Sequence, residues 1–486
     1  MISKNEKKLT IILFWTLIYT NTYAQNSQTN FIVFLADDVS WNDFGCYGNS
    51  DVQTPNIDKL ASEGLMFSNF YLTASSCSPS RNSILTGRYP HNTGAAELHT
   101  EPPLAMISFP EVLRNTNYYS AQAGKFHMGH YARRGFDVTS EDSKLNGDGG
   151  EHMWLKSIKE RPKDQPFFMW FASYDAHREW GPNEFSGSHA PDEINPPFYL
   201  ANGKETKSDL AKYYDEIKRF DFYIGKVIEE LESQNILDNT MIIVMADNGR
   251  PFPHSKTRVN DRGMKSPFIL HWPQAVKNKG GVCHSLVSAV DIAPTIMKIA
   301  KAKYSNTFQG YSFDSLIAKP DTKFRNFVFA EHNWHDYQAH ERMVRNRDFM
   351  YILNSRPSMA QSGPADAVGS PSYKELDILK NNGSLTTIQA DIFAVPRANE
   401  ELYDLKRDAL QLLNVGAVPK YKENLTFMRN VLTEWMQETG DNIPENLTND
   451  WYLKEPGYLK TQFYKIRGEM PGERLNATHN HNKGRF

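Results

Sequence analysis

The sequence predicts an α/β protein, with a mostly parallel sheet flanked by helices and a smaller C-terminal α/β domain. Three apolar runs, residues 31–36, 166–172 and 241–246, contain no polar side chain. Such runs are typical of strands that are buried on both faces of a parallel sheet. Amphipathic stretches separate the runs, and we expect them to form the helices that cover the sheet.

Each apolar run ends in a cluster of polar residues. The clusters are Asp37-Asp38, Tyr174-Asp175-Ala176-His177 and Asp247-Asn248. In open α/β sheets, ligands bind beyond the carboxyl ends of the strands. The polar residues at these ends are therefore the first candidates for a functional site.

A fourth strand is predicted over residues 118–123, followed by Lys125 and His127. In an extended chain these two side chains would point to the same side. Residues 209–232 carry apolar side chains at helical spacing, which predicts a long amphipathic helix with one face in the core.

The pattern changes after about residue 342. Residues 343–353 predict a strand, residues 401–405 a short polar and apolar segment, and residues 421–437 a helix. We therefore expect a large domain over residues 25–342 and a smaller one over residues 343–486.

Residues 1–24 have the pattern of a secretory signal peptide. Lys4, Lys7 and Lys8 precede an apolar run at residues 11–19, and Ala24 closes a potential cleavage site. The run is shorter than the roughly 20 residues of a membrane-spanning helix. We expect a cleaved peptide and a secreted or periplasmic protein without a membrane anchor; an uncleaved anchor is the alternative.

Composition limits the classes of partner. The 486 residues include 54 basic and 57 acidic side chains, a formal net charge of -3, so nucleic acid is not expected as a partner. Only Cys46, Cys77 and Cys283 occur, too few for a disulfide scaffold. The sequence leaves open whether Cys46 and Cys283 pair.

Cys77 lies just before a predicted helix. Ser78 can cap this helix, Pro79 fits its first turn, and Gly87 can end it. Arg81, four residues after Cys77, can lie on the same side of the first turn. The partial positive charge of a helix N-terminus favours an anion at this position.

The segment around Cys77 resembles the signature of the type I sulfatases, Cys-x-Pro-Ser-Arg followed by Leu-Thr-Gly-Arg. This sequence has Cys77-Ser78-Pro79-Ser80-Arg81 and Leu85-Thr86-Gly87-Arg88. The resemblance extends in the same order to Asp37-Asp38, Gly124 to Gly129, His177, Asp247-Asn248-Gly249 and Lys256. It implies an alkaline-phosphatase-like fold with a large α/β domain and a smaller C-terminal one.

The resemblance also implies catalytic roles. Cys77 would be oxidised to formylglycine (3-oxoalanine) by a formylglycine-generating or sulfatase-maturing enzyme, and its hydrate would attack sulfur. Arg81 and Lys125 would stabilise the developing negative charge. His127 would deprotonate the second hydroxyl of the hydrate. His177 and Lys256 would contact the sulfate and the leaving oxygen, with His177 as general acid.

Oxygen ligands in two of the polar clusters suggest a metal site. Asp37, Asp38, Asp247 and Asn248 form a hard ligand set that suits Ca²⁺ or Mg²⁺. The resemblance favours one calcium ion, with residue 77 also facing it. Such an ion would polarise a sulfate oxygen.

The expected substrate is a sulfated carbohydrate, such as the algal glycan ulvan or a glycosaminoglycan. In the segment 331–336, His332 and His335 are candidates for sugar contacts, and an ordinary surface loop is the alternative. Residues 175–178 and 247–253 resemble the heparan N-sulfatase branch, but that branch usually has Pro at Ala176 and Arg at Lys256. Sulfate esters and N-sulfate groups therefore both remain possible substrates.

Two other functions stay open. A phosphomonoester or phosphonate hydrolase could use the same fold, although such relatives usually bind two metals. A glycan-binding protein without activity would leave Cys77 unconverted.

Overall fold

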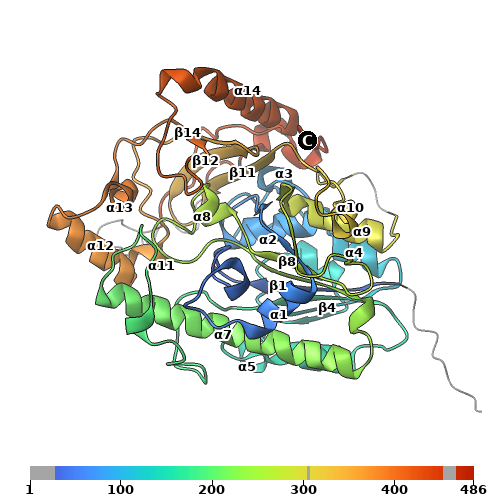
Figure 1. Ribbon diagram of the computed structural model, residues 1–486. Helices are drawn as coiled ribbons and strands as arrows, with labels where there is room; N and C mark the ends of the chain where they lie inside the picture. The colour runs from blue at the N-terminus through green and yellow to red at the C-terminus, as the bar shows by residue number, and fades with distance from the viewer. Residues whose placement is uncertain (1–27, 304–306, 452–466) are drawn as a thin grey trace, which may run out of the picture.

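The computed structural model describes residues 28–303, 307–451 and 467–486 (Figure 1). The predicted signal peptide, residues 1–24, lies outside the described residues and stays a prediction. Within the described ranges, no helix has both the length and the apolar character needed to cross a membrane.

The large sheet has eight strands in the order β5-β4-β6-β1-β7-β8-β2-β9. Their bounds are β1 Asn30–Ala36, β2 Leu65–Phe67, β4 Tyr119–Gly124, β5 Val138–Ser140, β6 Phe167–Ala172, β7 Thr240–Ala246, β8 Phe268–His271 and β9 Gly281–Cys283. β8 runs antiparallel to its neighbours β7 and β2, and the other neighbouring pairs are parallel. The predicted mostly parallel sheet is therefore confirmed. Strands β3 (Phe70–Tyr71) and β10 (Val287–Ser288) form a separate, short parallel pair.

Helices cover both faces of this sheet (Figure 1). On one face, Ile32 and Phe34 of β1 pack in a core with α1 (Pro55–Glu63), α6 (His152–Glu160) and α7 (Lys204–Ser233). On the other, Phe31 and Val33 share a core with α2 (Cys77–Thr86), α4 (Phe109–Arg114) and α9 (Ile292–Ile299). Because both faces are buried, the strands can be apolar throughout.

Short helices occur in the connections. They are α3 Pro90–Thr93, α5 Ser143–Asn146, α8 Asp261–Met264, α10 Asp314–Ala318, α11 Ala365–Val368, α12 Pro371–Asn381 and α13 Thr387–Ala390. α11 and α12 lie near one end of α7, and α8 lies between α2 and the second sheet in the view of Figure 1.

The second sheet is antiparallel, in the order β11-β12-β13-β14. Its strands are β11 Val328–Trp334, β12 Gln338–Arg345, β13 Phe349–Asn354 and β14 Glu400–Asp404. Helix α14 (Lys422–Thr439) covers it through Val431 and Trp435. The sheet begins at Val328, so the expected boundary after residue 342 falls within β12.

The prediction of one continuous strand over residues 343–353 was wrong, because the chain reverses in the middle of this range. Asn346 ends β12, and its Oδ1 accepts hydrogen bonds from the backbone N–H groups of Asp348 (2.8 Å) and Phe349 (2.7 Å). An asparagine side chain that bonds to its own backbone two residues on favours a turn over a continuous strand.

Buried polar contacts join the second sheet to the large domain. Glu331 of β11 accepts a hydrogen bond from His91 in α3 at 2.8 Å, and its backbone N–H donates to Thr73 at 2.9 Å. Arg88 donates to the backbone oxygens of Thr478 (3.0 Å) and Asn480 (2.9 Å) in the C-terminal segment. The second sheet is thereby held against the edge of the large sheet where the polar clusters lie.

Candidate active site

The carboxyl ends of β1 and β7 bring two acidic clusters together. The two strands pair in parallel up to Ala36 and Ala246, so the residues that follow them emerge side by side. The backbone N–H of Asp38 donates to Asp247 Oδ1 at 3.1 Å. Asp37, Asp38, Asp247 and Asn248 are all buried, as the sequence predicted for a site at this edge.

Cys77 is the first residue of α2, and Ser76 is the N-cap. The predicted cap, Ser78, was wrong: Ser78 lies inside the first turn, and its Oγ accepts a hydrogen bond from the backbone of His99 at 2.9 Å. Ser76 takes the cap position because its backbone is extended (φ -159°, ψ 133°). Gly87 ends the helix in the left-handed conformation, as predicted.

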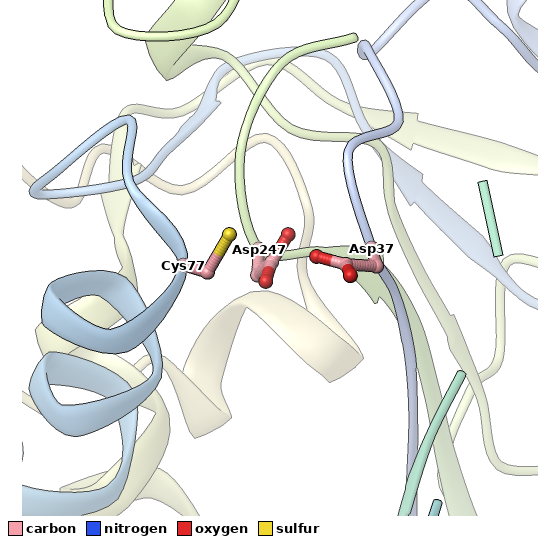
Figure 2. A group of neighbouring side chains, drawn as sticks. All are labelled: Asp37, Cys77 and Asp247. Carbon is pink, nitrogen blue, oxygen red and sulfur yellow. The ribbon is translucent and has the colours of Figure 1, made fainter. Parts of the chain in front are cut away.

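The Cys77 side chain points into the acidic cluster. Figure 2 shows Asp247 between Cys77 and Asp37, and one ligand atom from each of the three residues lies within 4.8 Å of the others. Cys77 Sγ is 3.9 Å from Asp38 Oδ1. Burial raises the pKa of the Cys77 thiol well above its usual value, so the unmodified thiol stays protonated.

Three cations neutralise the carboxylates, and of these Arg81 and Lys256 are buried whereas Lys125 is partly buried. Arg81 Nε contacts Asp247 Oδ2 at 2.8 Å, and Lys125 Nζ contacts Asp37. Lys256 Nζ lies 2.6 Å from Asp38 Oδ2. Burial alone would raise the pKa of Asp37, but the positive charge of Lys125, together with His177 and Arg81, outweighs this effect and the pKa is lowered.

The predicted arrangement of Lys125 and His127 was wrong. β4 ends at Gly124, and His127 has a φ of 44°, so the chain here is not extended and the two side chains do not share one side of a strand. His127 Nε2 lies instead 2.8 Å from His99 Nδ1. Burial, and after it the charge of Lys125, lower the pKa of His127 well below its usual value. His127 is therefore neutral and can accept a proton.

His177 lies near Asp38 and Asp366. Its Nε2 is 3.9 Å from both Asp38 Oδ2 and Asp366 Oδ2, and its Nδ1 contacts the backbone oxygen of Arg178. The Asp37, Lys125 and His177 side chains line a common cavity of about 790 Å³. The sequence prediction that His177 and Lys125 belong to one site therefore agrees with the structure.

The two candidates for sugar contacts are not on a surface loop. His332 belongs to strand β11 and is buried, and burial lowers its pKa to about 4. His335 is buried too, and its Nδ1 lies 2.8 Å from Ser76 Oγ, directly before Cys77. The polar segment 331–336 looked exposed in sequence because the second sheet that buries it is formed by distant residues.

Asp366 and His99 were not identified from the sequence. Asp366, in α11, contacts Lys256 Nζ at 2.9 Å and thus gives this lysine a second carboxylate partner. For Lys256, burial would lower the pKa, but Asp366 and then Asp38 raise it well above its usual value. Neither residue lies in a recognisable motif, so no pattern in the sequence could have pointed to them.

The residues fit a divalent cation. Asp37 Oδ1 and Asn248 Oδ1 are buried and have no hydrogen-bond partner within the described ranges, and an oxygen in this state is stabilised by a metal ion. Carboxylate and amide oxygens are hard ligands, which suit Ca²⁺ and Mg²⁺. The site thus combines possible metal ligands, a residue at a helix N-terminus and three cations, an arrangement that can bind and polarise an anionic group.

Comparison with known proteins places this arrangement in a family. The model of the Sulfatase family matches residues 29–302, and the model described as N-sulphoglucosamine sulphohydrolase, C-terminal, matches residues 254–351. An ulvan-active sulfatase of Formosa agariphila is 30% identical over 463 residues, covering 83% of this chain and 75% of the relative. Human N-sulphoglucosamine sulphohydrolase is 28% identical over 484 residues, covering 91% and 95%.

A solved structure has the same fold. The protein crystallised with D-glucosamine-2-N,6-O-disulfate superposes with a TM-score of 0.65 at 19% identity, covering 84% of this chain and 98% of that one. The family match spans more than half of the 486 residues and includes Asp37, Cys77 and Asp247. The chain therefore belongs to the sulfatase family and is a hydrolytic enzyme.

Proposed function

We propose that this sulfatase hydrolyses sulfate esters of a sulfated carbohydrate, using a formylglycine made from Cys77 and one calcium ion. The observation that carries the proposal is the position of Cys77, at the start of α2 and within 4.8 Å of Asp37 and Asp247 ligand atoms. The names of the relatives, an ulvan-active sulfatase and an N-sulphoglucosamine sulphohydrolase, support a carbohydrate substrate.

Formylglycine and the calcium ion have distinct tasks in this proposal. Formylglycine at position 77 supplies a hydrated aldehyde as the nucleophile toward sulfur. Asp37, Asp38, Asp247 and Asn248 would hold the calcium ion, which would supply a positive charge that polarises a sulfate oxygen. The free oxygens of Asp37 and Asn248 support this ligand set.

The chain's own residues bind the sulfate and move protons. Arg81, Lys125 and Lys256 surround Cys77 with positive charge, where the sulfate oxygens gain negative charge in the transition state. His127 Nδ1 has no hydrogen-bond partner among the described residues, which suits a group that accepts a proton from residue 77. His177 donates a proton to the leaving oxygen.

An N-sulfate substrate is the second candidate. It is favoured by the match of residues 254–351 to the N-sulphoglucosamine sulphohydrolase C-terminal model and by similarity to the human enzyme along 91% of this chain. Against it stand Ala176 and Lys256, which depart from the pattern of that branch. A panel of defined oligosaccharides with O-sulfate or N-sulfate groups, assayed for sulfate release, distinguishes the two.

A second assay, with aryl substrates, tests the rival phosphorus chemistry. We expect an aryl sulfate to be hydrolysed faster than the matching aryl phosphate and phosphonate ester. Faster cleavage of either phosphorus substrate would overturn the proposal.

Export from the cytoplasm, which the N-terminal pattern predicts, is tested by sequencing the N-terminus of the mature protein, where cleavage after Ala24 is expected.

Cys77 itself provides the most direct test. In protein made with a maturing enzyme, the mass of the peptide containing Cys77 should be lowered by the conversion of the thiol to an aldehyde. Cys77→Ala should abolish turnover, and Cys77→Ser should be nearly inactive, while both keep the parent's melting temperature within a few degrees. An unmodified peptide in inactive protein would instead favour a glycan-binding role, and activity in Cys77→Ala would rule out the nucleophile.

A further inference from the structure

A second cavity lies beside the active site, at the same edge of the large sheet. Its volume is about 680 Å³. Trp41 follows the end of β1, and Lys265 precedes β8. Because β8 is antiparallel to β7, the start of β8 lies at the edge where β1 and β7 end.

The cavity shares two loops with the catalytic centre. Ser40 and Trp41 follow Asp38 after one intervening residue, and Arg250 follows Asn248 after one intervening residue. The backbone N–H of Arg250 donates to Ser40 Oγ at 2.9 Å and ties the loops together. The residues that line the second cavity are nevertheless different from those around Cys77.

Aromatic rings form part of the cavity wall. Trp41, Phe198, Tyr199 and Tyr214 line it, and Phe198 is 45% exposed. Flat apolar faces of this kind can stack against the C–H groups of a sugar ring. Asn49 and Asn195 also line the cavity and offer amide groups for sugar hydroxyls.

Positive charge is available in the cavity. Lys265 Nζ lies 3.9 Å from the centre of the Trp41 ring, and among the described residues it forms no ion pair within 4.0 Å, although the nearby Asp261 carboxylate acts on its charge. Asp261, an acidic residue that also lines the cavity, is engaged by Arg345 at 2.9 Å and by Tyr71 at 2.9 Å. Burial lowers the pKa of Lys265.

Arg262 adds a second cation, which forms no ion pair within 4.0 Å among the described residues. Its Nη1 donates to the backbone oxygen of Leu410 at 2.8 Å and its Nε to that of His254 at 3.3 Å, both uncharged partners. Of the other charged groups, Arg250 is paired with Asp43 at 2.6 Å, whereas Asp51 is an acidic residue of the wall whose partner, the backbone N–H of Asn195 at 2.7 Å, is uncharged. Two cations beside aromatic rings therefore face the cavity.

We infer that this cavity is a second carbohydrate site, which binds an anionic sugar unit of the polysaccharide by stacking on Trp41 and pairing with Lys265 and Arg262. The inference rests on the proposed function for the class of ligand. A site of this kind holds the enzyme on a long sulfated chain without taking part in the chemistry.

The test separates binding from catalysis. Full-length Cys77→Ala protein is run in native gels that contain heparin or ulvan, so that hydrolysis cannot remove the ligand. Trp41→Ala and Lys265→Gln in this background should each bind roughly tenfold more weakly in at least one of these gels, as expected for the loss of one charged or stacking contact. Trp41→Phe should recover part of the retardation.

A control variant and a control gel show whether the loss of binding is specific to the cavity and to charged glycans. Lys277→Gln removes a lysine from the segment after β8, at the other edge of the sheet, and should bind like the parent; a gel with uncharged dextran should retard none of the proteins. Equal retardation of the parent and both cavity variants in heparin and in ulvan, or no retardation of the parent, would overturn the inference.

Failure of the proposed function is visible separately. With Cys77 intact, Lys265→Gln should hydrolyse an aryl sulfate at the parent's rate but show a raised KM on the sulfated polysaccharide. If no sulfate is released from any substrate, the proposed function fails, whereas the gel result still decides whether the cavity binds an anionic glycan.

Discussion

His177 differs from the other charged side chains around Cys77 in its exposure. Its side chain is 35% exposed, whereas those of Arg81 and Lys256 are fully buried. The leaving part of a large substrate must extend toward solvent, so the proton donor is expected on that side. This position favours His177 over Lys256 as the general acid.

For His177→Ala we expect unequal losses on two substrates. An aryl sulfate has a leaving group that needs little protonation, whereas a sugar alcohol needs a proton in the transition state. The loss in kcat should be greater on the carbohydrate sulfate by roughly a further 10² to 10⁴. Equal losses on both substrates would assign His177 to sulfate binding, and Lys256→Ala on the same pair would then show whether the lysine is the acid.

Asp366 is expected to position Lys256. Asp366→Asn removes the charge at 2.9 Å from Lys256 Nζ and should lower kcat/KM by roughly 10- to 100-fold, the range for a hydrogen bond between charged groups. Asp366→Glu should recover part of the activity. Asp377→Asn, on the exposed face of the neighbouring α12, is the control. An unchanged kcat/KM in Asp366→Asn would show that Asp38 alone is sufficient to hold the lysine.

At the scale of elements, α2 depends on how it begins and ends. Ser76 sets the start, so that Cys77 has a helical backbone and its side chain faces the ends of β1 and β7. Gly87 ends the helix with φ 59°, and a Cβ at this position would lie 3.0 Å from the Ala293 side chain. Gly87, a residue of the signature that follows Cys77, therefore contributes to the orientation of α2 as well as belonging to the motif that carries the chemistry.

Gly87→Ala should lower the stability of the protein. The left-handed backbone costs a residue with a Cβ roughly 1–2 kcal/mol, and the close contact with Ala293 adds to this. Gly383→Ala is a matched control, because Gly383 also has a positive φ (67°) but no atom within 4 Å of the added Cβ. Thermal unfolding should show a larger decrease in Tm for Gly87→Ala; equal decreases would mean that the contact with α9 contributes nothing.

At the scale of the whole molecule, a metal ion would link stability to activity. Asp37, Asp38 and Asp247 come from two strands and are brought together only in the folded chain, and burial raises the pKa of Asp247. A cation that binds only the folded state stabilises it by mass action. The effect extends to the entire large sheet because β1 and β7 lie at its centre.

Removal of metal by a chelator should therefore abolish activity and lower the Tm, and added calcium should restore both. Asp247→Ala should be inactive and should no longer respond to calcium. The measurement is thermal unfolding of stripped protein with and without calcium, at about 100 times the dissociation constant, where the expected gain is about 2.7 kcal/mol. A Tm that does not change with calcium in the parent would contradict the metal site.

Much of the large domain and the centre of the site could be predicted from the sequence. The runs that form β1, β6 and β7 are apolar because both of their faces are buried, and this pattern is local. The polar residues after these strands and the motif from Cys77 to Arg81 are also local signals. They grouped Asp37, Cys77, Arg81, Lys125, His177 and Asp247, and the resemblance to the sulfatases added Lys256; the structure places these residues close together.

Contacts between residues far apart in the chain were decided only by the tertiary structure. Asp366 reaches Lys256 across 110 positions, and His335 reaches Ser76 across 259. Local patterns reflect the faces that a strand or helix buries, whereas contacts of this kind depend on how complete elements pack, and no short stretch of sequence specifies that packing.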